Sequence, residues 1–132
     1  MDLKILEIAS NTENNKVIDN FTHKSKNKNP ICGDEMEISL VVKNDTVMDM
    51  GYQCKSCVYC QASVSLLSQK IKNKKLHEIK KFVVSCENFF ENTKIEIEKN
   101  WRDFLKLFDK KNISRKECLL LPLRTVLKAL KI

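Results

Sequence analysis

Glycine and proline are both scarce in this chain, with two residues of each among 132. Proteins built from many short strands need these residues at their tight turns, so the scarcity argues against an all-β fold and favours a helix-rich one. Long apolar runs are also missing, since none approaches the ~18 residues of a membrane span. Lys4 and Glu7 interrupt the N-terminal apolar residues too early for a signal-peptide core. The sequence therefore predicts no membrane association and a cytoplasmic location.

Apolar residues make up 42% of the chain and charged residues 31%, which is a globular balance. With no long linker or internal repeat, residues 1–132 are expected to form a single domain. The net charge is +7, and its densest group is Lys70, Lys72, Lys74, Lys75, Lys80 and Lys81. No aromatic residue interleaves with these lysines, so we interpret them as a solvated helix surface or a docking face for an acidic protein. Nucleic-acid binding is the least favoured interpretation.

A β-hairpin is the clearest structural prediction. Every second residue is apolar from Met36 to Val42 and again from Met48 to Cys54, which is the spacing of half-buried strands. Asn44 and Asp45 lie between them and tolerate the backbone of a tight turn. Before the hairpin, the sequence favours a short helix over residues 2–9, a strand over 16–23 and a basic loop over 24–30.

Helices are predicted over residues 58–71, 76–90 and 95–108, the last two from apolar residues at spacings of three and four. The C-terminal helix presents a conflict. Ser114 and Glu117 resemble a capping box that would start it at Arg115, but Pro122 would then lie inside it at a cost of ~3 kcal/mol. A start between Leu119 and Leu121 avoids most of that cost and is the one we predict, with Cys118 just ahead of the helix.

Six cysteines are present, and in a reducing compartment such residues are more often metal ligands, nucleophiles or core residues than disulfides. Cys32 lies in a loop that enters the hairpin, whereas Cys57 and Cys118 lie at predicted helix N-termini. A helix N-terminus stabilises a thiolate, the form that binds metal or attacks a sulfur donor. Asp34 could add an oxygen ligand and complete a tetrahedral set.

Three motifs resemble the IscU, SufU and NifU N-terminal family of iron–sulfur cluster scaffolds. The stretch from Asn29 to Asp34 resembles its N-P-x-C-G-D loop. Cys57 followed by Ala62-Ser63-x-Ser65 looks like a SufU stretch in which Cys60 replaces the first serine. Arg115-x-x-Cys118 with Leu121-Pro122 is similar to its R-x-x-C-x-x-L-P segment. The long interval between Cys57 and Cys118 is closer to SufU than to IscU, and Glu117 stands where IscU has a histidine.

The resemblance implies an α+β fold, a three-stranded antiparallel sheet with helices packed on one face. It also implies that Cys32, Cys57 and Cys118, with Asp34 as a fourth ligand or a tuner of release, hold zinc or a transient iron–sulfur cluster. Family members take persulfide sulfur from a cysteine desulfurase and pass clusters to apo-proteins. The sulfur acceptor would match Cys118 if the chain behaves like IscU, and Cys32 if it behaves like SufU.

The remaining cysteines and histidines have simpler interpretations. Cys86 lies on an apolar helical stripe and is expected in the core. Cys54, Cys57 and Cys60 form a C-x2-C-x2-C pattern, but the further Cys-Pro of a ferredoxin site is absent. Cys54 and Cys60 are therefore expected to be spare thiols near the main site. His23 and His77, without partners at ligand spacing, are expected to be surface or core residues.

Three functions remain open on the sequence alone. The leading one is an iron–sulfur cluster scaffold or carrier, which is not a turnover enzyme. The second is a zinc-dependent, SufU-like partner that receives persulfide and passes it on. The third is a structural zinc module that binds nucleic acid through its lysines.

Overall fold

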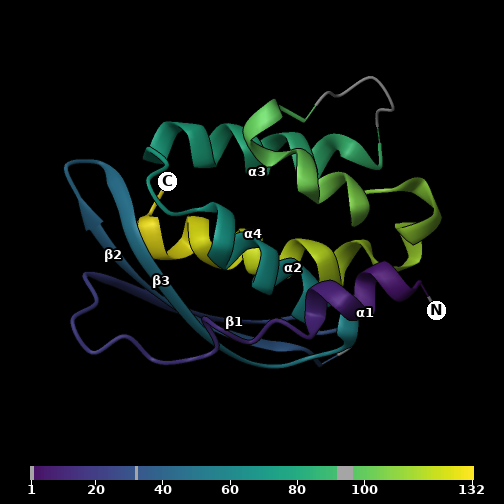
Figure 1. Cartoon of the computed structure of the whole chain (residues 1–132), viewed down its shortest axis with the longest axis horizontal. Helices are drawn as coiled ribbons and strands as arrows, with labels where there is room; N and C mark the ends of the chain where they lie inside the picture. Colours follow the sequence, from purple (N-terminus) through teal and green to yellow (C-terminus); the bar gives the residue numbers. More distant parts are fainter. Residues whose placement is uncertain (1, 32, 92–96) are drawn as a thin grey trace.

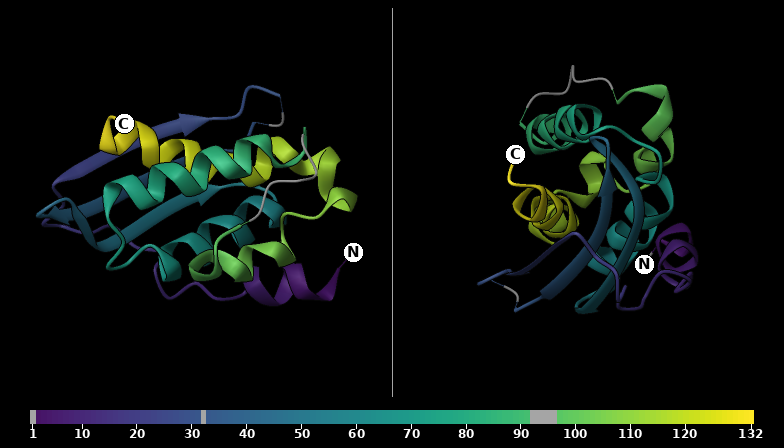
Figure 2. Two further views of the ribbon diagram at one scale, coloured as in Figure 1. Left: turned by 90° about the horizontal axis from the view of Figure 1, so that it is seen from above. Right: turned by 90° about the vertical axis from the view of Figure 1, so that its left-hand side faces the viewer.

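The computed structural model describes residues 2–31, 33–91 and 97–132. Strands β1 (His23–Lys28), β2 (Glu35–Lys43) and β3 (Thr46–Lys55) form an antiparallel sheet in the order β1-β2-β3. The other elements are α1 (Leu3–Ala9), α2 (Val58–Lys70), α3 (Leu76–Phe89), η1 (Lys99–Lys106), η2 (Lys110–Arg115) and α4 (Lys116–Leu130). Helices cover one face of the sheet (Figures 1 and 2), so the predicted α+β fold is confirmed.

The hairpin forms as its alternation predicts. Ile38 pairs with Tyr52 and Leu40 with Met50, and all four side chains are buried on the helix-covered side of the sheet. The turn residues Asn44 and Asp45 adopt φ values of 54° and 57°, the left-handed conformation that asparagine and aspartate tolerate.

The first strand was predicted in the wrong place. Residues 16–22 form no strand, and β1 occupies most of the segment expected to be a basic loop. Its sequence, HKSKNK, contains no apolar residue, and its exposed lysines pair with glutamates of β2. The Lys24 ammonium lies 2.9 Å from the Glu37 carboxylate, and the Ser25 hydroxyl donates to the Thr125 carbonyl of α4 at 2.7 Å.

The predicted helices α2 and α3 are confirmed, with ends within one residue of those expected. The region predicted as a helix over 95–108 begins outside the described residues, and its visible part is the 3-10 helix η1. Trp101, Phe104 and Phe108 are buried as expected, whereas Leu105 is exposed. Trp101 stacks on Phe82 of α3 with ring centroids 4.1 Å apart, which joins these two elements above the layer of α2 and α4.

The predicted start of the C-terminal helix is also wrong. Helix α4 begins at Lys116, directly after η2, and contains Pro122. The segment around the proline is buried from Cys118 to Leu123. At ~1.5–3 kcal/mol for each buried leucine side chain, packing outweighs the ~3 kcal/mol cost of the proline. As a consequence, Cys118 belongs to the first turn of α4 instead of preceding it.

Candidate metal site

Asp34 lies at the end of a hydrogen-bonded loop that precedes β2, and its side chain is buried. The Gly33 amide donates to the Asn29 carbonyl, and the Asn29 amide donates to the Asp34 carbonyl, both at 2.8 Å. Gly33 adopts φ +76°, a conformation that favours glycine over residues with a Cβ. The loop turns the Asp34 side chain inward, where the residue is 5% exposed.

Cys57 is the N-cap of α2, with extended backbone angles of φ −70° and ψ 168°. Its amide donates to Asp34 Oδ1 at 3.2 Å, so the carboxylate is bonded to the backbone of the residue that carries the thiol. The positive end of the α2 dipole lies at this position. The predicted helix N-terminus is confirmed for this cysteine.

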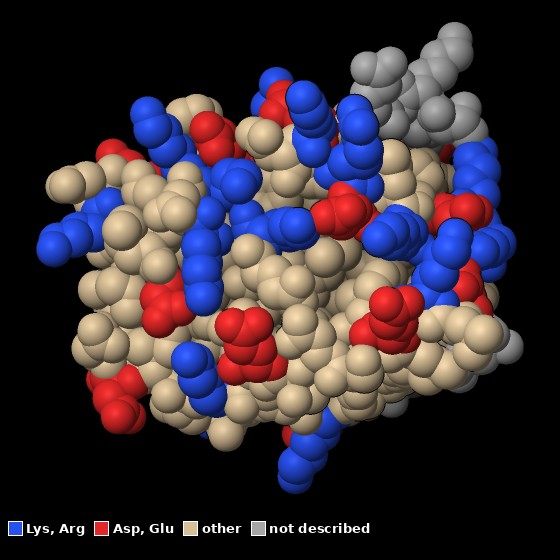
Figure 3. All heavy atoms as spheres, viewed as in Figure 1, with Lys and Arg blue, Asp and Glu red and all other residues tan. Residues whose placement is uncertain are grey.

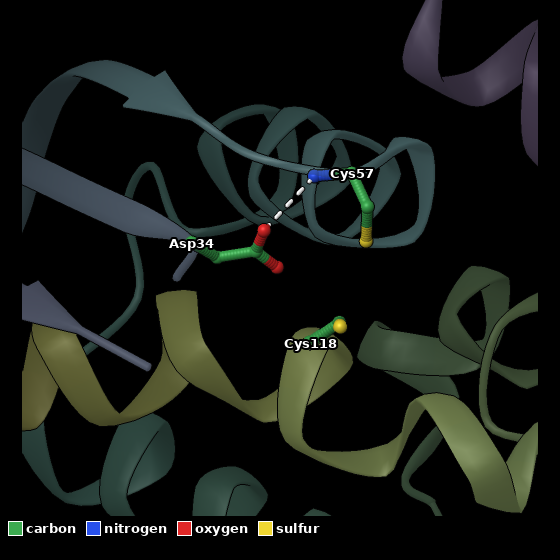
Figure 4. A group of neighbouring side chains, drawn as sticks. All are labelled: Asp34, Cys57 and Cys118. Carbon is green, nitrogen blue, oxygen red and sulfur yellow. Dashed lines mark hydrogen bonds between the residues drawn. The ribbon is translucent and has the colours of Figure 1, made fainter. Parts of the chain in front are cut away.

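Cys118 approaches from the opposite side, on the first turn of α4 (Figure 4). One oxygen of Asp34 and the Sγ atoms of Cys57 and Cys118 all lie within 4.8 Å of one another. In a tetrahedral zinc site, two thiolates lie about 3.8 Å apart, since each Zn–S bond is ~2.3 Å. The three side chains thus require only a small closure to share one metal ion.

The second oxygen of Asp34 strengthens this interpretation. Asp34 Oδ2 is buried and has no hydrogen-bond partner within the described ranges. A buried carboxylate oxygen without a partner carries a desolvation penalty that metal coordination would relieve. The two oxygens of Asp34 therefore have different roles. Oδ1 accepts the Cys57 amide, and Oδ2 is available to a metal (Figure 4).

Cys32, the remaining predicted ligand and one of the two candidate sulfur acceptors, lies outside the described residues. Its neighbours Ile31 and Gly33 belong to the loop that ends at Asp34. Ile31 is 83% exposed, so an apolar side chain faces solvent on this loop.

The other cysteines are not gathered into a metal site in the part of the chain that the structure describes. Cys60 is fully buried, and burial raises the pKa of its thiol far above the ordinary value. Burial also raises the pKa of Cys54, which lies near the Ser56 hydroxyl. Cys86 is fully buried in the core, as predicted, with its pKa raised by the same cause.

Lysines and acidic residues are interspersed on the face shown in Figure 3. Of the densest lysine group, Lys70 pairs with Asp103 at 2.8 Å, Lys72 with Asp49 at 3.5 Å and Lys81 with Glu98 at 2.6 Å. The Lys74 ammonium lies 5.5 Å from the centre of the Trp101 ring. Three of the six lysines thus have a carboxylate partner, which favours a solvated surface over a nucleic-acid site.

Two supports of the site had no signal in the sequence pattern alone. The Ser63 hydroxyl of α2 is fully buried and donates to the Leu119 carbonyl of α4 at 2.7 Å. It therefore joins α2, whose N-cap is Cys57, to the turn that carries Cys118. Near the start of α2, the Arg115 guanidinium lies 5.3 Å from the centre of the Tyr59 ring. Both contacts depend on tertiary packing. Ser63 and Arg115 belong to the motifs that resemble the scaffold family, but no pattern in the sequence predicts these two contacts.

Comparisons with known proteins agree with this architecture. A family model described as the NifU-like N terminal domain matches residues 2–94. The iron–sulfur cluster assembly scaffold protein IscU of Thermotoga maritima is 29% identical over 128 residues, covering 96% of this chain and 89% of that protein. An uncharacterised Borreliella burgdorferi protein is also 29% identical, over 81% of this chain and 70% of its own length.

Two solved structures share the fold. One is a NifU-like N-terminal protein from Brucella abortus, with a TM-score of 0.91, 18% identity, and coverage of 98% of this chain and 91% of the other. The second is a protein from Fervidobacterium islandicum named as an iron–sulfur cluster assembly scaffold for the SUF system. It has a TM-score of 0.88, 24% identity, and coverage of 98% and 96%. Within the described residues, no helix is long and apolar enough to span a membrane.

Proposed function

Because the chain belongs to the NifU-like N-terminal domain family, we propose that it is an iron–sulfur cluster assembly scaffold or carrier, with residues 1–132 acting as one domain. The relative from Thermotoga maritima carries the name of such a scaffold. The observation that carries the proposal is the convergence of Asp34, Cys57 and Cys118 from three different elements. Such a site holds and releases a cargo, so turnover of a substrate is not required of it.

The proposed ligand set is Cys32, Asp34, Cys57 and Cys118. Thiolates favour iron–sulfur clusters and zinc, and three of them with one carboxylate make a tetrahedral set. Cys57 lies at the α2 N-terminus, and Asp34 offers its buried Oδ2, which has no partner among the described residues. Cys32 precedes Asp34 by two residues in the chain, and its role as a ligand rests on the resemblance. The cluster would be transient cargo, with zinc occupying the same ligands in its absence.

We further propose that the chain accepts sulfur from a cysteine desulfurase and delivers clusters to apo-proteins in the cytoplasm. A thiolate of Cys118 or Cys32 would attack the outer sulfur of a desulfurase persulfide. The new S–S bond places the persulfide on this chain, and the desulfurase cysteine leaves as a thiolate. Cys118 is 5% exposed, so the site would have to open for a donor to reach its thiolate.

The test is anaerobic reconstitution of the purified chain with iron, a cysteine desulfurase and cysteine. A scaffold should develop the visible absorption of an iron–sulfur cluster, and Cys57→Ser should reduce it strongly while Cys86→Ala keeps it. Persulfide without a cluster would instead support the zinc-dependent sulfur-transfer function. Formation of neither product would contradict both and leave the structural zinc module.

A further inference from the structure

Helix α4 carries Cys118 on its first turn and Pro122 one turn later. Proline has no amide hydrogen, so position 122 cannot donate the helical hydrogen bond to the Cys118 carbonyl, and its ring crowds that carbonyl. One of the helical hydrogen bonds that would hold the Cys118 turn to the remainder of α4 is therefore missing. The Ser63 hydroxyl bond to the Leu119 carbonyl holds this turn to α2. A second restraint would help to keep Cys118 Sγ within 4.8 Å of Asp34 and Cys57.

A three-residue ion network provides a restraint that spans the proline. The Arg124 guanidinium donates to both carboxylate oxygens of Glu87 in α3, at 2.6 and 2.9 Å. Its remaining edge donates to the Glu117 carboxylate. Glu117 and Arg124 are seven residues apart, which is about two helical turns, so they lie on one face of α4 on either side of Pro122. All three side chains are between about one third and two fifths exposed, at 34–38%.

The Arg124 guanidinium is held more rigidly than the cation of an ordinary surface ion pair. A guanidinium that is bidentate to one carboxylate has a fixed plane, so its third contact holds Glu117 in a defined direction. Glu117 immediately precedes Cys118 in the chain. We propose that Arg124, held by Glu87 and Glu117, is a positioning residue. By contacting Glu117 on the other side of Pro122, it holds the Cys118 turn in place for metal binding, and this inference rests on the proposed metal function.

The sign of the effect separates positioning from simple electrostatics. Arg124 is a cation near a site proposed for a metal cation, so if charge alone mattered, its removal would strengthen zinc binding. Positioning requires the opposite result. Arg124→Gln should weaken zinc binding on the order of 10-fold, the lower end of losses seen when outer-shell partners are removed. Glu87→Gln, on a helix that carries none of the proposed ligands, should also weaken it, but loss of a negative charge predicts the same sign, so Arg124→Gln is the discriminating variant.

The experiment measures zinc affinity of the full chain by competition with a chromophoric chelator, together with the absorption spectrum of the Co²⁺-substituted protein. Arg124→Lys keeps the charge but loses the bidentate geometry, so an intermediate affinity is expected. The double variant Glu87→Gln/Arg124→Gln should be no worse than Arg124→Gln alone, because the two residues act as one unit. Lys70→Gln is the matched control, since it removes the 2.8 Å Lys70–Asp103 pair at the far end of α2 from Cys57. The control should bind zinc as the wild type does.

Several results would overturn the inference. Wild-type affinity and an unchanged Co²⁺ spectrum in Arg124→Gln would do so, as would tighter zinc binding. A loss of unfolding stability in the metal-free variant, with unaltered zinc affinity, would make the network merely structural. If the wild type binds neither zinc nor a cluster, the proposed function itself fails and this inference with it. A wild type that binds normally beside unaffected variants overturns the positioning role alone.

Discussion

The two carboxylate oxygens of Asp34 have different surroundings, and this difference makes the residue testable. Oδ1 accepts the Cys57 amide, whereas Oδ2 is buried without a partner among the residues described. We expect Asp34→Ala to keep the fold and to slow cluster transfer to an apo-ferredoxin. A carboxylate is a harder and more exchangeable ligand for cluster iron than a thiolate, so its loss should hinder opening of the site. Transfer rates of reconstituted wild type and variant are measured side by side.

Asp34→Asn provides the control for the structural role of Oδ1. Its amide oxygen can still accept the Cys57 amide, but the side chain has lost its charge. It should retain more stability than Asp34→Ala, which leaves that amide unpaired at about 1–3 kcal/mol. Equal transfer rates for all three proteins, at equal cluster loading, would reduce Asp34 to a loop residue.

Cys86 is the cysteine for which the structure predicts no role in the site. It is fully buried on α3, in the core. Cys86→Ala should leave zinc content unchanged and lower the free energy of unfolding by about 1 kcal/mol, through the lost packing of a small apolar side chain. Metal analysis and urea unfolding check the two parts. A drop in metal content comparable to that of Cys57→Ser would contradict the assignment.

The candidate site shows which residue-level features a sequence can reveal. Predicted position and the family motifs select Asp34, Cys57 and Cys118 together with Cys32. The structure brings the first three together, and their role as ligands stays a prediction. Spacing could not reveal the Arg124 network or the Ser63 bond to the Leu119 carbonyl. Each of these joins elements far apart in the chain, and their polar partners have no periodic pattern that a sequence reading could detect.

At the scale of elements, alternation and helical spacing identified those strands and helices whose apolar faces meet the core. They failed for β1, where the strand is specified by pairing with β2 and not by apolar residues. They also failed for the start of α4, because a local rule about proline was weighed without the burial of residues 118–123. In both cases tertiary contacts outweighed local preference.

The outer face of the sheet gives a prediction at this scale. Residues 14–18 run along β3 and over this face, since the Tyr52 amide donates to the Asn14 carbonyl at 3.1 Å. A Cβ on Gly51 would collide with the Lys16 carbonyl and lie 2.9 Å from Ile18 Cγ1. Gly51→Ala should therefore destabilise the fold by about 1–3 kcal/mol, because the covering segment must move.

Urea unfolding measures this loss, and Gln53→Ala is the matched control two residues along the same strand. Gln53 is exposed, so its truncation should change stability by less than about 0.5 kcal/mol. If Gly51→Ala were as mild as the control, the covering segment would have to be loosely attached to β3.

At the scale of the whole molecule, the apolar core is built mostly from residues outside the proposed metal site, although Cys118 belongs to it and Cys57 packs against it. Its largest fully buried side chains include Phe104, Ile38 and Leu67, and none is a proposed ligand. A chain of this length buries enough surface to fold without a metal. By contrast, structural zinc modules owe their folding to the ion and unfold when it is removed. Metal removal therefore discriminates between a scaffold and the third function considered above.

We expect the protein purified in air to contain one zinc ion per chain, because three thiolates and a carboxylate suit zinc without any redox step. After chelation under reducing conditions, the chain should keep its circular dichroism spectrum and a cooperative thermal transition. Zinc at 100 times its dissociation constant should then add about 2.7 kcal/mol of stability. A metal-free preparation with intact reduced thiols would contradict zinc binding. Unfolding on chelation would contradict the scaffold and make the metal structural, since a scaffold must remain folded each time it releases its cargo.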